Sequence, residues 1–461
     1  MSFASVEFLL FLGFTLAATA FLERRFPERA KEIFLLAASY FFYGYWDWRF
    51  CFLLLFVTAA SYWAGRESGS KAAFLAGVIV PLVVLGFFKY FNFFLSSAAA
   101  LAGREIGALR IILPVGISFY TFQALSYVID VRRGKIPVER DFIKLALYIS
   151  FFPQLVAGPI VKAKEFLPQL HEKRRVSWEG IQWGVQVFAF GLFKKIVLAD
   201  NISVFVDDVY HAPAAYHWAT ILLAAVSYSL QIYFDFSGYS DMAIGCAKCF
   251  GYDFSRNFNL PYISQNVTEF WRRWHISLST WLKEYIYIPL GGNRKGKARQ
   301  YLNLFLTMLL GGLWHGADWT FVFWGALNGA ALCLDKVLPH KKGAPLRRIG
   351  GVLVTFTFIT LTWVFFRAES FAAAWAVLRG IFTLQQGVRQ PFSWSFAALA
   401  LLLLCTLAAE TRAHRQGAET VGYYPIADLN TVRGQTAFFI LLGLILGLAY
   451  TGQNPFVYFQ F

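Results

Sequence analysis

Two of the seven histidines lie in sequence surroundings where an imidazole could do chemistry. His315 lies in an apolar and aromatic run, TMLLGGLWHGADWTFVFWG (307–325), and His275 in a more polar run, EFWRRWHISLSTWLKEY (269–285). The pKa of a free histidine, about 6.5, is close to working pH, so a histidine in a dry pocket can act as a general base. An ionisable residue in an apolar segment is by default a hypothesis of function. The structural alternative for His315 is a neutral imidazole that is hydrogen-bonded inside a helix bundle.

The neighbours of His315 favour a reactive site over that alternative. Three glycines flank the histidine: Gly311, Gly312 and Gly316. Glycine lets a ligand or a backbone approach closely, and the indoles of Trp314 and Trp319 are rigid walls that exclude water. Asp318 lies three residues further on, which is one turn if the helix continues, and its carboxylate could then orient the imidazole. We therefore predict a general base at His315, with Trp314 and Asp318 beside the substrate.

The surroundings of His275 indicate a wall that binds an anion. Three cations and three tryptophans are interleaved there: Arg272, Arg273, Lys283, Trp271, Trp274 and Trp281. A guanidinium donates forked hydrogen bonds to phosphate, and an indole offers a stacking face. We predict that Arg273 and Trp274 contact a phosphorylated or nucleotide-bearing donor, and that Asn259, upstream in the same run, contacts the substrate. The alternative is a basic amphipathic helix lying on anionic lipid.

Polar side chains also gather at the end of an apolar segment near residue 231. Gln231, Asp235 and Tyr239 lie there, and Asp241 follows. Two carboxylates at that position are costly unless they face water or a partner. We predict that Gln231, Asp235 and Tyr239 line a path for the substrate; packing of the carboxylates against arginines of the loops is the alternative.

Motifs of other enzyme classes are absent from the sequence. It contains no G-x-S-x-G, P-loop, H-E-x-x-H or G-x-G-x-x-G pattern. Without a nucleophilic serine, direct transfer is favoured: a bound hydroxyl loses its proton to a histidine and attacks a carbonyl. Cys246 and Cys249 form one C-x-x-C without a second pair or a nearby histidine. A structural zinc site needs four ligands, so helix packing explains this pair better and we predict no metal.

The elements that must hold these residues are predicted to be membrane helices. The chain is 57% hydrophobic and 15% charged, whereas soluble domains are about 25% charged. Apolar segments of roughly 17–25 residues recur, and such a segment crosses a bilayer as a helix. We expect an all-α, polytopic bundle of about 11–13 spanning helices in one domain, 1–461. The expected spans lie near 5–22, 33–46, 49–65, 73–97, 108–129, 182–199, 218–234, 301–316, 319–338, 350–367, 394–410 and 435–451.

Two segments depart from this pattern. Segment 142–161 is apolar but contains Pro153, Gly158 and Pro159, which interrupt a helix. We expect a short re-entrant or broken helix there, buried in protein. Segment 235–294 is amphipathic and too polar to span, so we expect helices that lie in the interface or line a funnel.

The net charge of +15 does not indicate a nucleic-acid binder. The basic residues lie in short connections between apolar runs, such as 23–32, 130–144 and 162–175. That pattern is typical of cytoplasmic loops. At the N-terminus the charges follow the apolar run, which predicts a first transmembrane helix and not a cleaved signal peptide. No internal repeat is visible, which counts against an inverted-repeat transporter.

Long runs of the sequence resemble the membrane-bound O-acyltransferase family, and within it the bacterial branch of alginate O-acetyltransferases. These runs are NFNLPYISQNVTEFWRRWHISLSTWLKEYIYIPLGGNR (257–294), GGLWHGADWTFVFWG (311–325), PVGISFYTFQALSYVIDVRRGKI (114–136), FFPQLVAGPIV (151–161) and FVYFQF (456–461). The resemblance extends in order and length from residue 1 to residue 461. Together the runs are far more specific than any one of them alone.

The resemblance implies roles for both histidines. It makes His315 the essential membrane histidine of the family and His275 its second conserved polar position. It further implies a funnel or tunnel through a bundle in the bacterial inner membrane, which acetyl-CoA enters from the cytoplasm while no cofactor stays bound. The acetyl group would pass to an exported or surface polysaccharide, alginate-like, through a periplasmic or surface acetyltransferase partner. As a hypothesis, His275 lies nearer the entrance for the donor and His315 deeper.

Three alternatives stay open at the level of the sequence. One is D-alanyl transfer to teichoic acid, within the same family. The others are a membrane transporter of an anionic polymer or lipid and a structural subunit of a polysaccharide export complex. The identity of the acceptor is equally open.

Overall fold

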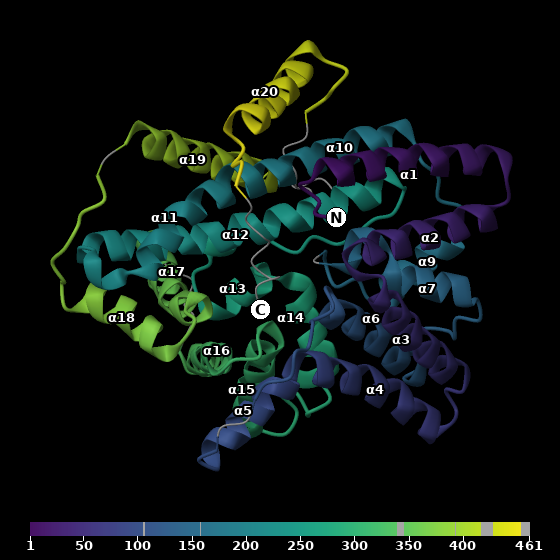
Figure 1. Cartoon of the computed structure of the whole chain (residues 1–461), viewed down its shortest axis with the longest axis horizontal. Coiled ribbons are helices and arrows are strands. Elements are labelled where there is room, and N and C mark those ends of the chain that lie inside the picture. Colours follow the sequence, from purple (N-terminus) through teal and green to yellow (C-terminus); the bar gives the residue numbers. More distant parts are fainter. Residues whose placement is uncertain (105–106, 157, 339–344, 392, 416–426, 453–461) are drawn as a thin grey trace. The chain divides into compact units, whose positions relative to one another are not determined.

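The computed structural model describes the chain except residues 105–106, 157, 339–344, 392, 416–426 and 453–461 (Figure 1). Within the described part the regular elements are helices, besides an isolated parallel bridge between Tyr216 and Val388. The all-helical prediction is therefore confirmed. The terminal FVYFQF run lies outside the described residues.

The helices gather into two compact units. Unit 1 contains Met1–Phe188 and Met242–Ser255, and unit 2 contains Ala189–Asp241 and Arg256–Phe461. The single domain over 1–461 stays a prediction, because grouping by contacts does not define a domain.

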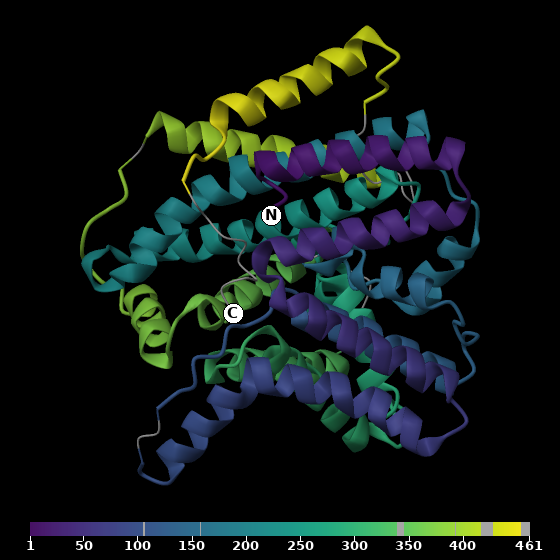
Figure 2. The ribbon, with the colours of Figure 1, turned by 45° about the vertical axis from the view of Figure 1, so that its right-hand side comes forward.

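Unit 1 is built from the N-terminal helices. Its elements are α1 (Val6–Arg25), α2 (Glu28–Asp47), α3 (Arg49–Arg66), α4 (Lys71–Leu85), η1 (Gly86–Tyr90), α5 (Phe91–Leu101), α6 (Ile117–Arg132), α7 (Phe142–Ser150), α8 (Phe152–Leu155), α9 (Ala163–His171) and most of α10 (Trp178–Leu192). Helix α2 packs against α1, α3 and α7, and α3 packs against α4 and α6. Figure 2 shows α1 and α2, both in purple, side by side.

Unit 2 contains both histidines of interest. Its elements are η2 (Phe193–Ala199), α11 (Asp200–His211), η3 (Pro213–Ala215), α12 (Trp218–Cys249, up to Asp241), η4 (Pro261–Ile263), α13 (Val267–Arg273), α14 (Ile276–Leu282), η5 (Lys283–Tyr287), α15 (Lys297–His315), α16 (Trp319–Val337), α17 (Pro345–Arg367), α18 (Phe371–Phe382), α19 (Trp394–Arg415) and α20 (Val432–Leu448). Helix α16 lies between α15 and α17 and contacts both.

The hairpin of α15 and α16 depends on close backbone contact. A Cβ atom at Gly312 would lie 2.3 Å from the carbonyl oxygen of Phe321, and one at Gly325 would lie 2.5 Å from that of Met308. Side chains at these two positions would force the helices apart, and small residues at a helix crossing are typical of membrane bundles. The tight crossing holds the C-terminal turn of α15, which ends at His315, against α16.

Several helices of the described chain are long and apolar enough to cross a membrane. By length and composition these are Val6–Arg25, Lys71–Leu101, Trp218–Cys249, Leu346–Arg367 and Phe396–Ala413. A multi-pass membrane protein is therefore supported, and the predicted count of about 11–13 spans stays a prediction.

Two predicted boundaries are wrong. The span expected at 108–129 begins as a helix only at Ile117. The span expected at 218–234 continues to Cys249, so the first part of segment 235–294 is helical and belongs to a candidate span. The break expected in segment 142–161 is confirmed, because α7 ends at Ser150 and the four-residue α8 follows with Pro153 in its first turn.

Candidate active site

His315 is the last residue of α15 and lies in an aromatic enclosure. Its side chain is 4% exposed. Its ring centroid lies 5.3 Å from those of Trp324 and Phe366 and 5.0 Å from that of Trp314. Trp324 stacks in turn on Trp363. Unit 2 therefore holds the imidazole in a rigid, largely dry setting, as the apolar run around it predicts.

His275 lies beside His315, although the two are far apart in the sequence. Their ring centroids are 6.2 Å apart. His275 is fully buried, and its ring meets Phe236 edge-on at 4.6 Å and lies 5.9 Å from Trp314. His275 joins α13 to α14 and lies outside the candidate membrane spans. Burial lowers the pKa of His275 to about 3. His275 is therefore neutral at physiological pH.

A cavity of about 530 Å³ reaches His315. That volume lies within the usual range for a site that binds a small molecule. One wall of the cavity is formed by residues of α15 that are spaced three or four apart and therefore lie on one face of the helix. This stripe consists of Gln300, Leu304, Thr307, Met308, Gly311 and His315. From Gln300 to His315 the stripe extends about 22 Å, at about 1.5 Å per residue. The cavity is therefore elongated, and its length suits a chain-like ligand.

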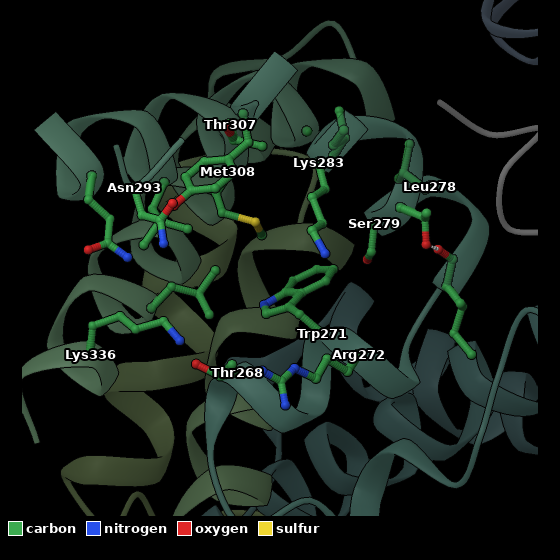
Figure 3. Close-up of a pocket in the computed structure, with 18 of the residues that line it drawn as sticks. Thr268, Trp271, Arg272, Leu278, Ser279, Lys283, Asn293, Thr307, Met308 and Lys336 are labelled. Atoms are coloured by element: carbon green, nitrogen blue, oxygen red, sulfur yellow. Dashed lines mark hydrogen bonds between the residues drawn. The ribbon is translucent and has the colours of Figure 1, made fainter. Parts of the chain in front are cut away.

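Three cations line the same cavity. Figure 3 shows the side chains of Arg272, Lys283 and Lys336 directed into the space around the Trp271 indole. Within the described part of the chain, no carboxylate lies within ion-pairing distance of these three groups. Cations that lack an internal counter-ion attract an anionic ligand. The cavity thus combines a cationic region with a histidine in its wall.

The position of Lys336 follows from the antiparallel pairing of α15 and α16. The thiol of Cys333 contacts the carbonyl of Tyr301, and Gly329 lies against Phe305. Lys336 therefore lies level with the start of α15, many turns away from His315. The cavity has a cation at one end of the hairpin and the histidine at the other.

Helix α13 is fixed to α16 through its first turn. The backbone N–H of Thr268 donates to Asp335 Oδ2 at 3.1 Å, and the Thr268 hydroxyl donates to the same oxygen. The side chain of Asn266 caps the helix by accepting from the N–H of Glu269 at 2.7 Å. These contacts set where Trp271 and Arg272, one turn further on, enter the cavity wall.

The three residues predicted to contact the donor near His275 lie just outside this wall. Trp274 is fully buried and stacks on Phe270. Arg273 forms an ion pair with Glu269 at 2.9 Å and donates to the carbonyl of Asn259 at 3.1 Å. The neighbouring Trp271 and Arg272 line the cavity instead. Substrate contact by Trp274, Arg273 and Asn259 stays a prediction.

The carboxylates of Asp235 and Asp241 on α12 are buried in a network of ion pairs. Lys195 Nζ lies 2.5 Å from Asp235 and 2.7 Å from Asp200, and Lys194 Nζ lies 2.5 Å from Asp241. Lys194 also contacts Glu410 at 3.1 Å. The partners of the carboxylates are thus lysines of η2. The alternative given in the sequence analysis was packing of these carboxylates against arginines of the loops.

Gln231 and Tyr239 lie on the same helix as Asp235, at spacings of four residues. Both side chains are buried, at 6% and 2% exposed. A substrate path along this face of α12 stays a prediction for all three residues. Neither Gln231 nor Tyr239 lines the cavity described above.

Asp318 does not lie one turn above His315 on a continuous helix. Helix α15 ends at His315, and Asp318 caps α16, where its carboxylate accepts from the N–H of Thr320 at 2.8 Å. The premise of a continuing helix is therefore wrong, because Gly316 leaves the helix in an extended conformation. Contact between Asp318 and the substrate stays a prediction. Contact between Trp314 and the substrate also stays a prediction; the Trp314 side chain is 5% exposed and lies beside both histidines.

The sequence interpretation missed most polar groups of the cavity. Asn293, Gln300, Thr307 and Lys336 line it and were not predicted. A signal was present for Gln300 and Thr307, which fall on the helical stripe that ends at His315. Lys336 carries no such signal, because its place depends on how the hairpin pairs.

The arrangement can bind a long ligand with an anionic end and present its other end to a histidine. His315 has the surroundings of a general base, since its ring reaches the cavity and is otherwise enclosed by aromatic rings. A neutral His275 adds a potential hydrogen-bond donor within the same enclosure. Such a pair suits transfer of an acyl group to a hydroxyl.

Comparison with known sequences agrees with this chemistry. A sequence model of the membrane-bound O-acyltransferase family matches residues 136–340. The chain is 43% identical over 372 residues to a Pseudomonas aeruginosa protein named probable alginate O-acetylase, covering 77% of this chain and 70% of that protein. It is 37% identical over 482 residues to the Azotobacter vinelandii protein of the same name, covering 94% and 95%. It is 38% identical over 407 residues to a peptidoglycan O-acetyltransferase of Helicobacter pylori, covering 80% and 76%.

Proposed function

The chain belongs to the membrane-bound O-acyltransferase family, and from that premise we propose that it transfers an acetyl group from acetyl-CoA toward an exported polysaccharide, with His315 as the general base. It is an O-acetyltransferase of the alginate O-acetylase type. The observation that carries the finer proposal is the elongated cavity that is lined by Arg272, Lys283 and Lys336 and reaches His315.

The shape and charge of the cavity support a thioester donor. Acetyl-CoA has a phosphate-bearing nucleotide at one end and the reactive thioester at the end of a long flexible arm. Arg272, Lys283 and Lys336 would hold the phosphates, and the arm would lie along the α15 stripe. The carbonyl carbon would then lie beside His315.

The proposed reaction needs one base and one hydrogen-bond donor. His315 accepts the proton of the attacking hydroxyl as the new C–O bond forms at the thioester carbonyl. The C–S bond then breaks, and the leaving thiolate takes that proton back from the imidazolium, so protons balance. His275 is neutral because burial holds its pKa near 3, and a neutral imidazole N–H can donate to the oxygen that becomes negative in the tetrahedral intermediate.

The charge around the hairpin supports a cytoplasmic entrance for the donor. Arg294, Lys295, Lys297 and Arg299 are exposed at the start of α15, and Lys336 is exposed at the end of α16. Basic residues next to membrane helices favour the cytoplasmic side. In this orientation the open end of the hairpin faces acetyl-CoA and its closed end, with His315, lies deeper in the bacterial inner membrane.

The acceptor and the partner are proposed from the relatives. Alginate and peptidoglycan appear in the names of two kinds of relative, so we propose an exported glycan as the final acceptor. A periplasmic or surface acetyltransferase would complete the transfer.

The proposal is tested by the O-acetyl content of surface glycans. A strain that lacks this gene should lose O-acetyl groups, measured by mass spectrometry, and the wild-type gene should restore them. His315→Ala, expressed and inserted at the wild-type level, should not. Full restoration by His315→Ala would overturn the assignment, and an unchanged glycan with D-alanyl esters lost elsewhere would favour D-alanyl transfer.

A further inference from the structure

Two segments of unit 2 are joined by main-chain hydrogen bonds next to His275. The N–H of Asn259 donates to the carbonyl of Arg273 at 2.9 Å, and the N–H of Ile276 donates to the carbonyl of Asn257 at 2.8 Å. The loop that precedes η4 therefore runs beside the junction of α13 and α14. His275 lies between the two bonded positions.

The side chain of Asn257 makes further contacts across this junction. Its Oδ1 accepts from the N–H of Ser277 at 3.2 Å and from the Ser277 hydroxyl at 2.9 Å. Its Nδ2 donates to the hydroxyl of Ser240 on α12 at 3.2 Å. Asn257 is 1% exposed. One buried amide thus connects α12, its own loop and the first turn of α14.

The backbone at His275 requires such support. His275 has φ 42° and ψ 58°, the left-handed conformation that a residue with a side chain rarely adopts. A conformation of this kind persists only where the surroundings impose it. It also determines the direction of the imidazole, because the same residue in a right-handed turn would direct its Cβ elsewhere.

We propose that Asn257 is a positioning residue for His275: its side chain holds the left-handed turn that directs the His275 imidazole toward His315. The proposal rests on the proposed function, in which His275 stabilises the intermediate. Asn257 does not touch the substrate in this account. It acts through the geometry of its neighbour.

The test compares Asn257→Ala with a matched control, Asn328→Ala. Asn328 is also fully buried, but its amide donates to the carbonyl of Trp324 one turn earlier on the same helix, α16. Asn257→Ala keeps the main-chain bond to Ile276 and removes the three side-chain bonds. We expect kcat for acetyl transfer from acetyl-CoA to fall about 10- to 100-fold with little change in KM, since a small misplacement of a catalytic group has effects of this size. Asn328→Ala should keep the wild-type kcat per folded molecule.

Two further variants separate positioning from general damage. Asn257→Asp keeps the acceptor oxygen for Ser277 and should recover most of the lost kcat. Adding Asn257→Ala to His275→Ala should cause no additional loss, because residues that act through one group are not additive. The proposal would be overturned if kcat of the double variant fell below that of His275→Ala by the factor that Asn257→Ala alone causes. A wild-type kcat for Asn257→Ala would also overturn it.

A readout that needs no activity completes the test. His275 is fully buried, so diethyl pyrocarbonate should modify it slowly in the wild-type protein and faster in Asn257→Ala, as mapped by mass spectrometry. Unchanged modification would overturn the proposal. If Asn257→Ala fails to fold, Ser277→Ala, which removes a single hydroxyl contact, should show the same effects at smaller size, and wild-type behaviour there counts against the proposal. Absence of acetyl transfer by the wild-type protein would instead contradict the proposed function.

Discussion

Removing the three cations of the cavity should weaken binding of acetyl-CoA while leaving the chemical step intact. The variant combines Arg272→Met, Lys283→Met and Lys336→Met, which keep most of the length of each side chain and remove its charge. In our account these three groups contact the phosphates of the donor and do not take part in the reaction at His315. We therefore expect a higher KM for acetyl-CoA and a nearly unchanged kcat.

The size of the effect follows from the exposure of the three side chains. All three are exposed to solvent, so their attraction to a phosphate is screened. Two unit charges about 4 Å apart in a water-like dielectric interact by about 1 kcal/mol. That corresponds to about fivefold in KM for each cation, and to about 100-fold for three that act independently. The effect on KM should shrink as the salt concentration rises.

The assay is the initial rate of acetyl transfer by purified protein in lipid nanodiscs, over a range of acetyl-CoA concentrations. Arg433→Met serves as the control for loss of an exposed cation elsewhere, because Arg433 is exposed on α20 and lies outside the cavity. Acetyl-pantetheine, which lacks the nucleotide phosphates, should show no change in KM in the triple variant. Equal KM values for acetyl-CoA in the triple variant and the wild type would refute the assignment of the cations.

Three further predictions concern the packing and the second histidine. Gly312→Val should lower the melting temperature in detergent, because a Cβ at this position would lie 2.3 Å from the Phe321 carbonyl oxygen. Overpacking of this kind costs about 1–3 kcal/mol. An unchanged melting temperature would argue against the close crossing of α15 and α16. Lys195→Met should destabilise the protein by about 3–5 kcal/mol, because it removes the cation next to the buried carboxylate of Asp235. Adding Asp235→Asn should recover part of the lost stability. No recovery in the double variant would contradict the pairing of Lys195 with Asp235. His275→Ala should lower kcat but leave the pH dependence of the rate unchanged between about pH 5 and 8. The reason is that His275, with a pKa of about 3, stays neutral across that range. A shifted pH profile in the variant would show that His275 titrates in the reaction.

The sequence was sufficient for the class of the fold and for the two histidines. Helices follow from apolar segments of membrane length, and the family follows from long runs that include both His275 and His315. The proximity of these residues was implied only by the resemblance. It depends on a left-handed residue at 275, which has no signature in the sequence, and on the end of α15 at 315, which Gly316 and the capping residue Asp318 could have indicated.

The sequence interpretation was weakest where buried polar groups satisfy one another. The carboxylates after residue 234 made that segment look too polar for a span. Helix α12 continues through them because lysines of η2 pair with Asp235 and Asp241. Such a pairing joins residues far apart in the chain, and hydropathy along one segment cannot detect it.

The cavity was predicted in part. The alternation of cations and tryptophans near residue 272 indicated an anion-binding wall, and Arg272, Lys283 and Trp271 do line the cavity. The choice between neighbours, Arg272 over Arg273 and Trp271 over Trp274, depends on the rotation of a seven-residue helix. Its short length leaves the apolar periodicity too weak to define which face is buried.

The central claim is that the thioester reacts beside His315, and single-turnover transfer by His315→Ala tests it most directly. Purified wild-type and variant protein in nanodiscs would be loaded with radiolabelled acetyl-CoA, and transfer to a hydroxyl acceptor would be followed by rapid quench. We predict that binding of acetyl-CoA is unchanged while the rate of transfer falls about 10²- to 10⁴-fold, as for loss of a general base. A folded His315→Ala variant that transfers acetyl at the wild-type rate would contradict the account.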